Sequence, residues 1–195
     1  KSHAEKFVQL PKLNGKQSKD LKIKFVRYDG NTNGHMVVDL KNTSRKSQSF
    51  SADGLYFVPK GNPEQAPQRL GASGPFVEIT KTKTSNIKKS TSLKAGETKR
   101  IRLAVFCIDS HRASPTPKTQ FSIAQKRLPK KLRKSLKASN SQIYRKHKQS
   151  LKRARKEIQT NMWKTRDANW IKLEGERVKE KAPKNYRNQI RHNRI

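Results

Sequence analysis

The residues best suited to chemistry stand together in one segment, CIDSHRASPTP, which begins at Cys107. Within six residues it offers a thiol, a carboxylate, an imidazole and a guanidinium: Cys107, Asp109, His111 and Arg112. Three uses are open. Cys107, Asp109 and His111 could ligate a metal, Cys107 could act as a nucleophile, or the polar groups could hydrogen-bond the backbone of the Pro-rich turn that follows.

The third use is favoured over the other two. Zinc usually takes a fourth ligand from a distant cluster, and the chain has no second cysteine to supply one. Cys107 lies on the apolar side of a predicted strand, where a thiol is buried as a small hydrophobic group. We therefore interpret Cys107, Asp109, His111 and Arg112 as a structural motif and expect no metal site and no cofactor.

Other acid and base residues do not form a catalytic set. Glu174, Glu176 and Glu180 lie among lysines and arginines, which predicts i,i+3 and i,i+4 salt bridges along a helix. The five histidines are scattered and include no HExxH spacing. No residue is therefore predicted to be catalytic, and an enzyme is not expected.

Strands must hold this segment in place, because apolar residues alternate with polar ones from Asp20 to Phe121. The alternation is clear in the first strand, at Leu21, Ile23 and Phe25, and in the last, where four apolar residues share one face: Ile101, Leu103, Val105 and Cys107. Candidate strands between them cover residues 35–40, 54–59 and 75–80. Strands at this spacing, without amphipathic helices between them, predict an antiparallel immunoglobulin-like sandwich.

The pattern changes to a helical one after Phe121. Pro129 suits a first helical turn, and Leu132 and Leu136 follow at helical spacing. A longer helix is predicted from Ser141 to about Lys164, with an apolar stripe that recurs every three to four residues: Ile143, His147, Leu151, Ala154, Ile158 and Met162. The remaining residues show no period and predict an extended tail that becomes ordered on a partner.

These patterns divide the chain into an N-terminal arm (residues 1–19), a β-sandwich domain (20–122) and a basic helical extension with a tail (123–195). The predicted fold class is mainly β, an antiparallel immunoglobulin-like sandwich followed by a basic α-helical C-terminal extension.

The segment LKAGETKRIRLAVFCIDSHRASPTP, followed by FSIAQKRLPKKLRKSL, resembles the last strands and exit of immunoglobulin-like domains in secreted bacterial accessory proteins. IQTNMWKTRDANW, from Ile158 to Trp170, resembles a helix that often follows such domains. The resemblance covers about half of the chain. It implies the sandwich fold and an extracytoplasmic location, periplasmic or secreted, after signal cleavage, although the basic charge departs from that family.

Charge gives the strongest indication of function. The chain carries 47 Lys and Arg against 14 Asp and Glu, a net charge of +33. Charge of this size destabilises a compact free chain by self-repulsion, so an anionic partner is expected. Residues 123–195 hold 24 of the cations and 5 of the acids, which makes this region the predicted contact surface.

The predicted partner-binding residues are the cations of the helices and tail together with two interleaved tryptophans. They are Lys130, Lys131, Arg133, Lys134, Arg145, Lys146, Lys152, Arg153, Arg155, Lys156, Trp163, Trp170, Arg187, Arg191 and Arg194.

Two kinds of partner are compatible with this surface. The first is an acidic protein surface, which would make the chain a non-catalytic structural or accessory subunit of a large protein assembly. The second is RNA, which would make it a ribosome-associated, RNA-binding subunit, although the chain contains no recognised RNA-binding motif. We favour the first. No run of about 18 apolar residues is present, so a membrane-spanning segment is not expected.

Overall fold

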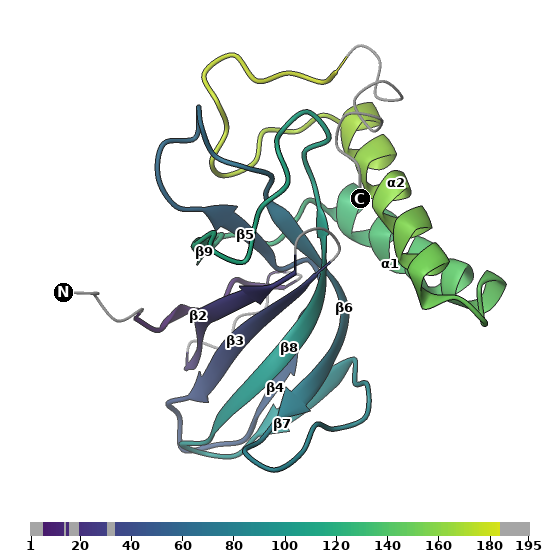
Figure 1. The fold of residues 1–195 in the computed structure, drawn as a ribbon. Coiled ribbons are helices and arrows are strands. Elements are labelled where there is room, and N and C mark those ends of the chain that lie inside the picture. Colours follow the sequence, from purple (N-terminus) through teal and green to yellow (C-terminus); the bar gives the residue numbers. More distant parts are fainter. Residues whose placement is uncertain (1–5, 14, 16–19, 31–33, 184–195) are drawn as a thin grey trace.

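The described part of the chain contains nine strands and two helices, and these strands pair antiparallel throughout (Figure 1). The computed structural model describes residues 6–13, 15, 20–30 and 34–183. The strands are β1 (Val8–Gln9), β2 (Leu21–Asp29), β3 (His35–Asn42), β4 (Gln48–Ser51), β5 (Tyr56–Pro59), β6 (Leu70–Ile79), β7 (Ser90–Leu93), β8 (Thr98–Cys107) and β9 (Phe121–Ile123).

Seven of the strands form one curled sheet in the order β1-β2-β3-β8-β6-β5-β9, and β4 pairs with β7 in a separate ribbon. The curl brings β2 near β9, where Phe25 and Tyr28 both meet the ring of Phe121 edge to face, at centroid distances of 6.0 and 5.7 Å. The sheet is therefore nearly closed.

A β-bulge between Phe25 and Arg27 assists this closure. The extra residue shifts the alternation by one position, so Tyr28 is buried on the same side as Phe25 although the two are three residues apart. A second irregularity, between Ala72 and Phe76, interrupts the pairing of β6 with β8. Such bulges bend and twist a strand, as a nearly closed sheet requires.

The predicted mainly antiparallel β class is confirmed, and so is the burial of the four alternating residues of β8, each 0% exposed: Ile101, Leu103, Val105 and Cys107. The immunoglobulin-like arrangement is not confirmed. An immunoglobulin sandwich divides its strands between two facing sheets, whereas here seven strands follow one another in a single sheet.

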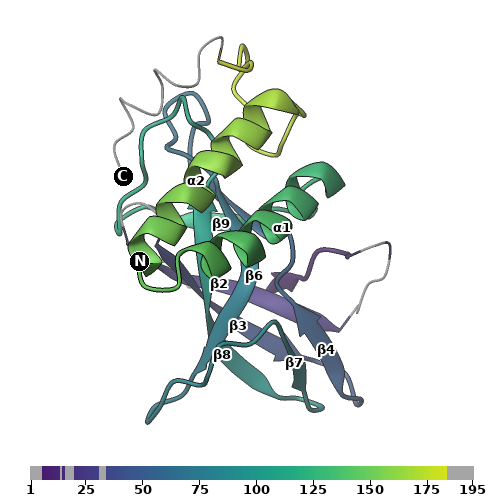
Figure 2. The ribbon, with the colours of Figure 1, turned by 90° about the vertical axis from the view of Figure 1, so that its right-hand side faces the viewer.

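Helices α1 (Lys130–Lys146) and α2 (Leu151–Ala168) form a hairpin against the sheet (Figure 2). The predicted continuous helix from Ser141 to Lys164 is therefore wrong. The chain turns at residues 147–150, where the Ser150 hydroxyl accepts a hydrogen bond from the Arg153 amide and caps α2. None of the described helices is long and apolar enough to cross a membrane.

Two apolar clusters stabilise the fold. The first fills the curled sheet and includes Trp163 of α2. The second lies between the hairpin and the sheet, where Ile158 and Met162 of α2 join Phe106 and Ile108 at the end of β8. The helices therefore complete the core of the β region.

Candidate functional site

A buried arginine–carboxylate cluster joins the end of β8 to α2 and to the segment after it. Three arginines face three carboxylates, so the formal charges balance. The cluster consists of Arg69, Asp109, Arg112, Arg166, Glu176 and Glu180.

Arg69 and Asp109 form the centre of the cluster, and both are 0% exposed. The guanidinium donates twice to the carboxylate, through Nε to Oδ2 at 2.9 Å and through a terminal nitrogen to Oδ1 at 2.7 Å. The Arg69 amide also donates to Oδ2, at 3.0 Å. Burial alone would raise the pKa of Asp109, but the hydrogen bonds and charge of Arg69 outweigh it and hold that pKa below its ordinary value.

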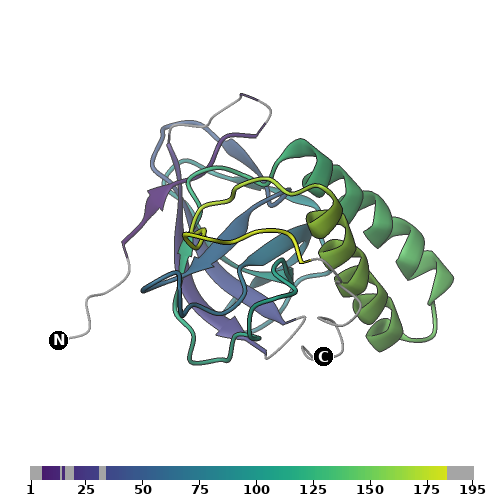
Figure 3. The same cartoon turned by 90° about the horizontal axis from the view of Figure 1, so that it is seen from above.

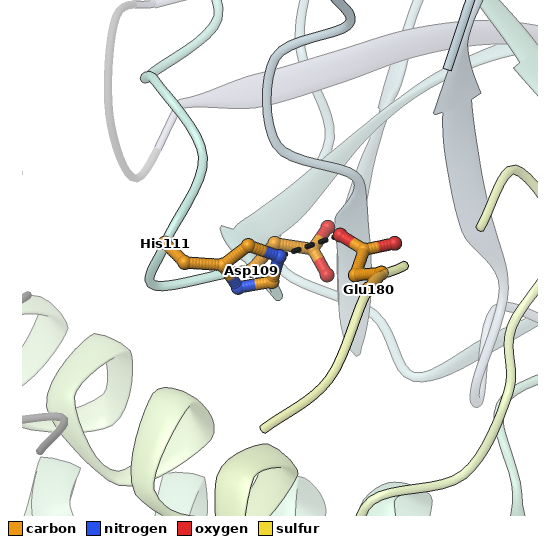
Figure 4. Close-up of side chains that lie close together, drawn as sticks. All are labelled: Asp109, His111 and Glu180. Atoms are coloured by element: carbon orange, nitrogen blue, oxygen red, sulfur yellow. Dashed lines mark hydrogen bonds and ion pairs between the residues drawn. The ribbon is translucent and has the colours of Figure 1, made fainter. Parts of the chain in front are cut away.

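Arg112 and Glu180 repeat the bidentate pairing, with both nitrogen–oxygen distances at 2.7 Å. His111 Nε2 lies 2.5 Å from the same carboxylate (Figure 4). The Arg177 amide also donates to this carboxylate, at 3.0 Å. Burial would raise the pKa of Glu180, but the hydrogen bonds from His111 and Arg112 hold it well below its ordinary value.

The segment after α2 reaches the cluster through a close approach to β5; in Figure 3, which views the molecule from above, this segment (yellow) lies in front of the curled sheet. Gly175 has a φ of +81°, and a Cβ there would lie 2.5 Å from Cγ1 of Val58. Only glycine tolerates both the conformation and the contact. Next to it, Glu176 accepts a hydrogen bond from Arg166 at 3.0 Å.

The predicted helical salt bridges of Glu174, Glu176 and Glu180 are therefore wrong. No helix forms there in the described part of the chain, and Glu176 and Glu180 pair with arginines 10 to 111 residues away. The prediction of an extended tail is wrong for residues 171–183, because this segment docks on the domain. Residues 184–195 lie outside the described part.

In the CIDSHR segment, which we interpreted as a structural motif, the polar side chains have distant partners. Asp109 and Arg112 bond Arg69 and Glu180, and Ser110 donates to Asp167, so long-range pairs replace the expected bonds to the Pro-rich turn. Cys107 is buried, and the Gln159 side chain bonds both its amide and its carbonyl at 2.7 Å.

Asp109, His111 and Glu180 offer ligand atoms within 4.8 Å of one another, which raises the question of a metal ion. Both oxygens of Asp109 accept from Arg69, and both oxygens of Glu180 accept from Arg112. A metal ion would have to displace these guanidinium groups and would stand beside their charges. These carboxylates are therefore suited to ion pairs with the arginines of the cluster and are not suited to a metal centre.

The contribution of Glu180 to the stability of the arginine–carboxylate cluster should depend on pH, and it can be measured by comparing the chain with Glu180→Gln. Because the folded pKa of Glu180 is lowered, its stabilisation is present above the unfolded value of about 4.3 and is lost as pH falls below it. We expect the variant to melt at least about 4 °C lower at pH 7, with a smaller gap at pH 3, because the stabilisation is lost progressively between the unfolded pKa and the lowered folded pKa. A gap in Tm that is the same at both pH values would contradict the assignment.

A second feature is the solvent face of the helical hairpin. Every exposed charged side chain that the structure describes on residues 130–168 is a cation; these are Lys130, Lys131, Lys134, Lys137, Arg145, Lys146, Lys148, Lys152, Arg153, Lys156 and Lys164. We call this set the basic face. The hairpin's two acids, Glu157 and Asp167, are half-buried.

Eight of the predicted partner-binding residues belong to the basic face, and four others have structural contacts. Arg133 is half-buried, with its side chain beside Gly54. Arg155 donates to the Gly34 carbonyl at 3.1 Å and lies over the Phe106 ring at 4.8 Å, so it attaches α2 to the sheet.

Neither tryptophan presents an exposed ring that a partner could contact. Trp163, predicted to meet a partner, is 0% exposed and donates its indole N–H to Gln68 at 2.9 Å, because a large aromatic ring at the α2–sheet interface fills the core. Trp170 is half-buried under the Arg166 guanidinium, 3.7 Å from the ring centre. The predicted Arg187, Arg191 and Arg194 lie outside the described residues.

Comparison with protein-family models, with curated proteins and with solved structures finds no match.

Proposed function

We propose that this protein is a non-catalytic structural or accessory subunit that binds an acidic protein surface through its basic face. One observation carries the proposal: all eleven described exposed charges on the hairpin are positive. A surface of one sign steers and holds a partner of the opposite sign. A location outside the cytoplasm and a relation to immunoglobulin-like accessory domains belong to the same proposal and rest on the short motifs around residues 93–170.

The placement of cations at the helix starts supports a partner. The first turns of α1 and α2 contain no acid and include Lys130, Lys131, Lys152 and Arg153. Cations there oppose the helix dipole, which favours negative charge at a helix N-terminus. These charges therefore cost folding stability in the free chain, and an acidic partner would relieve that cost.

RNA is the second candidate, because lysines and arginines on a helix can also neutralise phosphates. Stacking on unpaired bases has less support among the described residues, since Trp163 is buried and Trp170 is covered. An acidic protein surface needs no aromatic platform, and we favour it for that reason.

The test is a charge reversal on α2, Lys152→Glu/Arg153→Glu/Lys156→Glu, in which all three side chains are exposed. We expect binding to poly-L-glutamate at 100 mM salt to weaken at least about tenfold, because like charges then oppose each other. Fluorescence anisotropy gives the Kd, and circular dichroism checks the fold.

A matched control changes the same charge elsewhere: Arg45→Glu/Lys46→Glu/Lys94→Glu, in turns beside β4 and β7 and far from the hairpin (Figures 1 and 2). Equal weakening by both triple variants would show that net charge alone binds. The tethered native chain should also retain an acidic protein from its source after nuclease treatment, and the α2 variant should lose it. Retention of RNA alone, lost on nuclease treatment, would replace this proposal with the RNA candidate.

A further inference from the structure

A groove of about 650 Å³ lies between the tip of the helical hairpin and the outer face of the sheet. Tyr144 and Leu151 line it from the hairpin, Ala104 from β8, and Ile87 from the loop after β6. Its volume falls within the roughly 300 to 1,000 Å³ typical of small-molecule sites. It is separate from the arginine–carboxylate cluster, with which it shares no lining residue.

The groove is strongly basic. Four cations line it from four separate segments: Lys89, Arg102, Arg145 and Arg155. Among the described residues that line it there is no Asp or Glu. Asp29 of β2 stands opposite His35 in the β2–β3 pairing, but it forms an ion pair with Arg27 at 3.0 Å. An anion in the groove would therefore meet cations from several sides.

Apolar side chains also line the groove, and two of them are unusually exposed. Ile87 is 76% exposed and Leu151 is 64% exposed, although both are large hydrophobic residues. Val77 and Ala104, both half-buried, contribute further apolar surface from β6 and β8. An occupant with an apolar body would cover this surface and gain about 25 cal/mol for each Å² removed from water.

We propose that the groove binds a small organic anion that has an apolar body and a single carboxylate or similar acidic head. Its body lies against Ile87, Leu151 and Ala104, and its head faces Arg102 and Lys89. Cations combined with large apolar side chains fit this class of ligand better than a simple inorganic anion, which makes no use of the apolar surface. The groove shares Arg145 with the basic face, but the residues changed in the α2 triple variant, Lys152, Arg153 and Lys156, do not line it.

His35 provides a local sensor of occupancy. Burial, together with the charges of Arg155 and Arg102, lowers its pKa to about 4. Asp29, on the neighbouring strand, acts in the opposite direction. A bound carboxylate would offset the two arginines, so the His35 pKa should rise by about one unit on binding.

The experiment uses decanoate below its micelle concentration as the probe and decanol as its neutral counterpart. We expect decanoate to bind at one site by titration calorimetry and decanol to bind at least tenfold more weakly. Lys89→Gln/Arg102→Gln should weaken decanoate binding about tenfold, whereas the matched control, Arg45→Gln/Lys94→Gln, should leave it unchanged. Ala104→Phe should also weaken it, because the larger side chain fills the groove on a strand that accommodates aromatic residues.

Three results would overturn the proposal. Equal binding of decanol would show that the anionic head is not recognised. Equal weakening by the two Gln double variants would show that decanoate follows net charge. A His35 pKa unchanged by decanoate in an NMR titration would place the probe elsewhere. The α2 triple variant of the basic face should bind decanoate normally, so failure of either proposal is detected without the other.

Discussion

Asp109→Ala is expected to destabilise the protein by about 3–5 kcal/mol. The substitution leaves the Arg69 guanidinium buried, with both of its strongest acceptors removed. An uncompensated buried charge costs far more than an exposed ion pair contributes. Chemical denaturation followed by circular dichroism measures the change in free energy of unfolding.

The chain offers a matched control in Asp39, which also forms a bidentate pair with an arginine, at 2.8 and 3.1 Å to Arg100. The Arg100 side chain is 44% exposed, so Asp39→Ala should cost about 1 kcal/mol or less. The double variant Arg69→Met/Asp109→Leu should be more stable than Asp109→Ala, because it removes both charges of the pair. An equal loss of unfolding free energy for Asp109→Ala and Asp39→Ala would contradict a stabilising role for the buried arginine–carboxylate cluster.

Period-two alternation predicted the strands correctly where one face is buried and the other is solvated. The face of β8 formed by Ile101, Leu103 and Val105 was clear from the sequence alone, because strand neighbours point to opposite sides. The curvature of the sheet could not be predicted, because no residue type marks the bulge that places Tyr28 beside Phe25. A nearly closed sheet was therefore not distinguished from a sandwich.

The helical stripe was correct at Ala154, Ile158 and Met162, which are all buried. The buried face of α2 is wider than that stripe, because Gln159 and Arg166 are buried there with specific partners. A search for apolar residues at helical spacing cannot predict the burial of polar residues, even where their hydrogen bonds are satisfied inside the core.

Most of the arginine–carboxylate cluster was missed for a related reason. Arg69 lies in a Gly- and Pro-rich stretch and Glu180 in the basic C-terminal region, 111 residues apart. No local pattern connects them. One signal was available: three of the five acids among residues 123–195 fall between Glu174 and Glu180, and acids concentrated in a basic region indicate a specific internal use.

A truncation series should separate the contributions of the C-terminal elements, and the largest effect is expected when the hairpin is removed. A chain ending at Pro129 loses α1, α2 and the docked segment, and it exposes Phe106, Ile108 and Tyr56 of the second cluster. Exposed apolar surface of this extent favours unfolding or aggregation. We expect no cooperative thermal transition for this chain.

Two longer chains make the series decisive. A chain ending at Pro183 retains every described element and should melt like the full chain. A chain ending at Trp170 keeps both helices but removes Glu176 and Glu180, which leaves Arg112 and Arg166 without their carboxylates. It should fold with a Tm lowered by about 10 °C or more, since unpaired buried charges cost several kcal/mol. A chain ending at Pro129 that melts cooperatively near the Tm of the full protein would show that the sheet is an independent domain and that the hairpin is only its appendage.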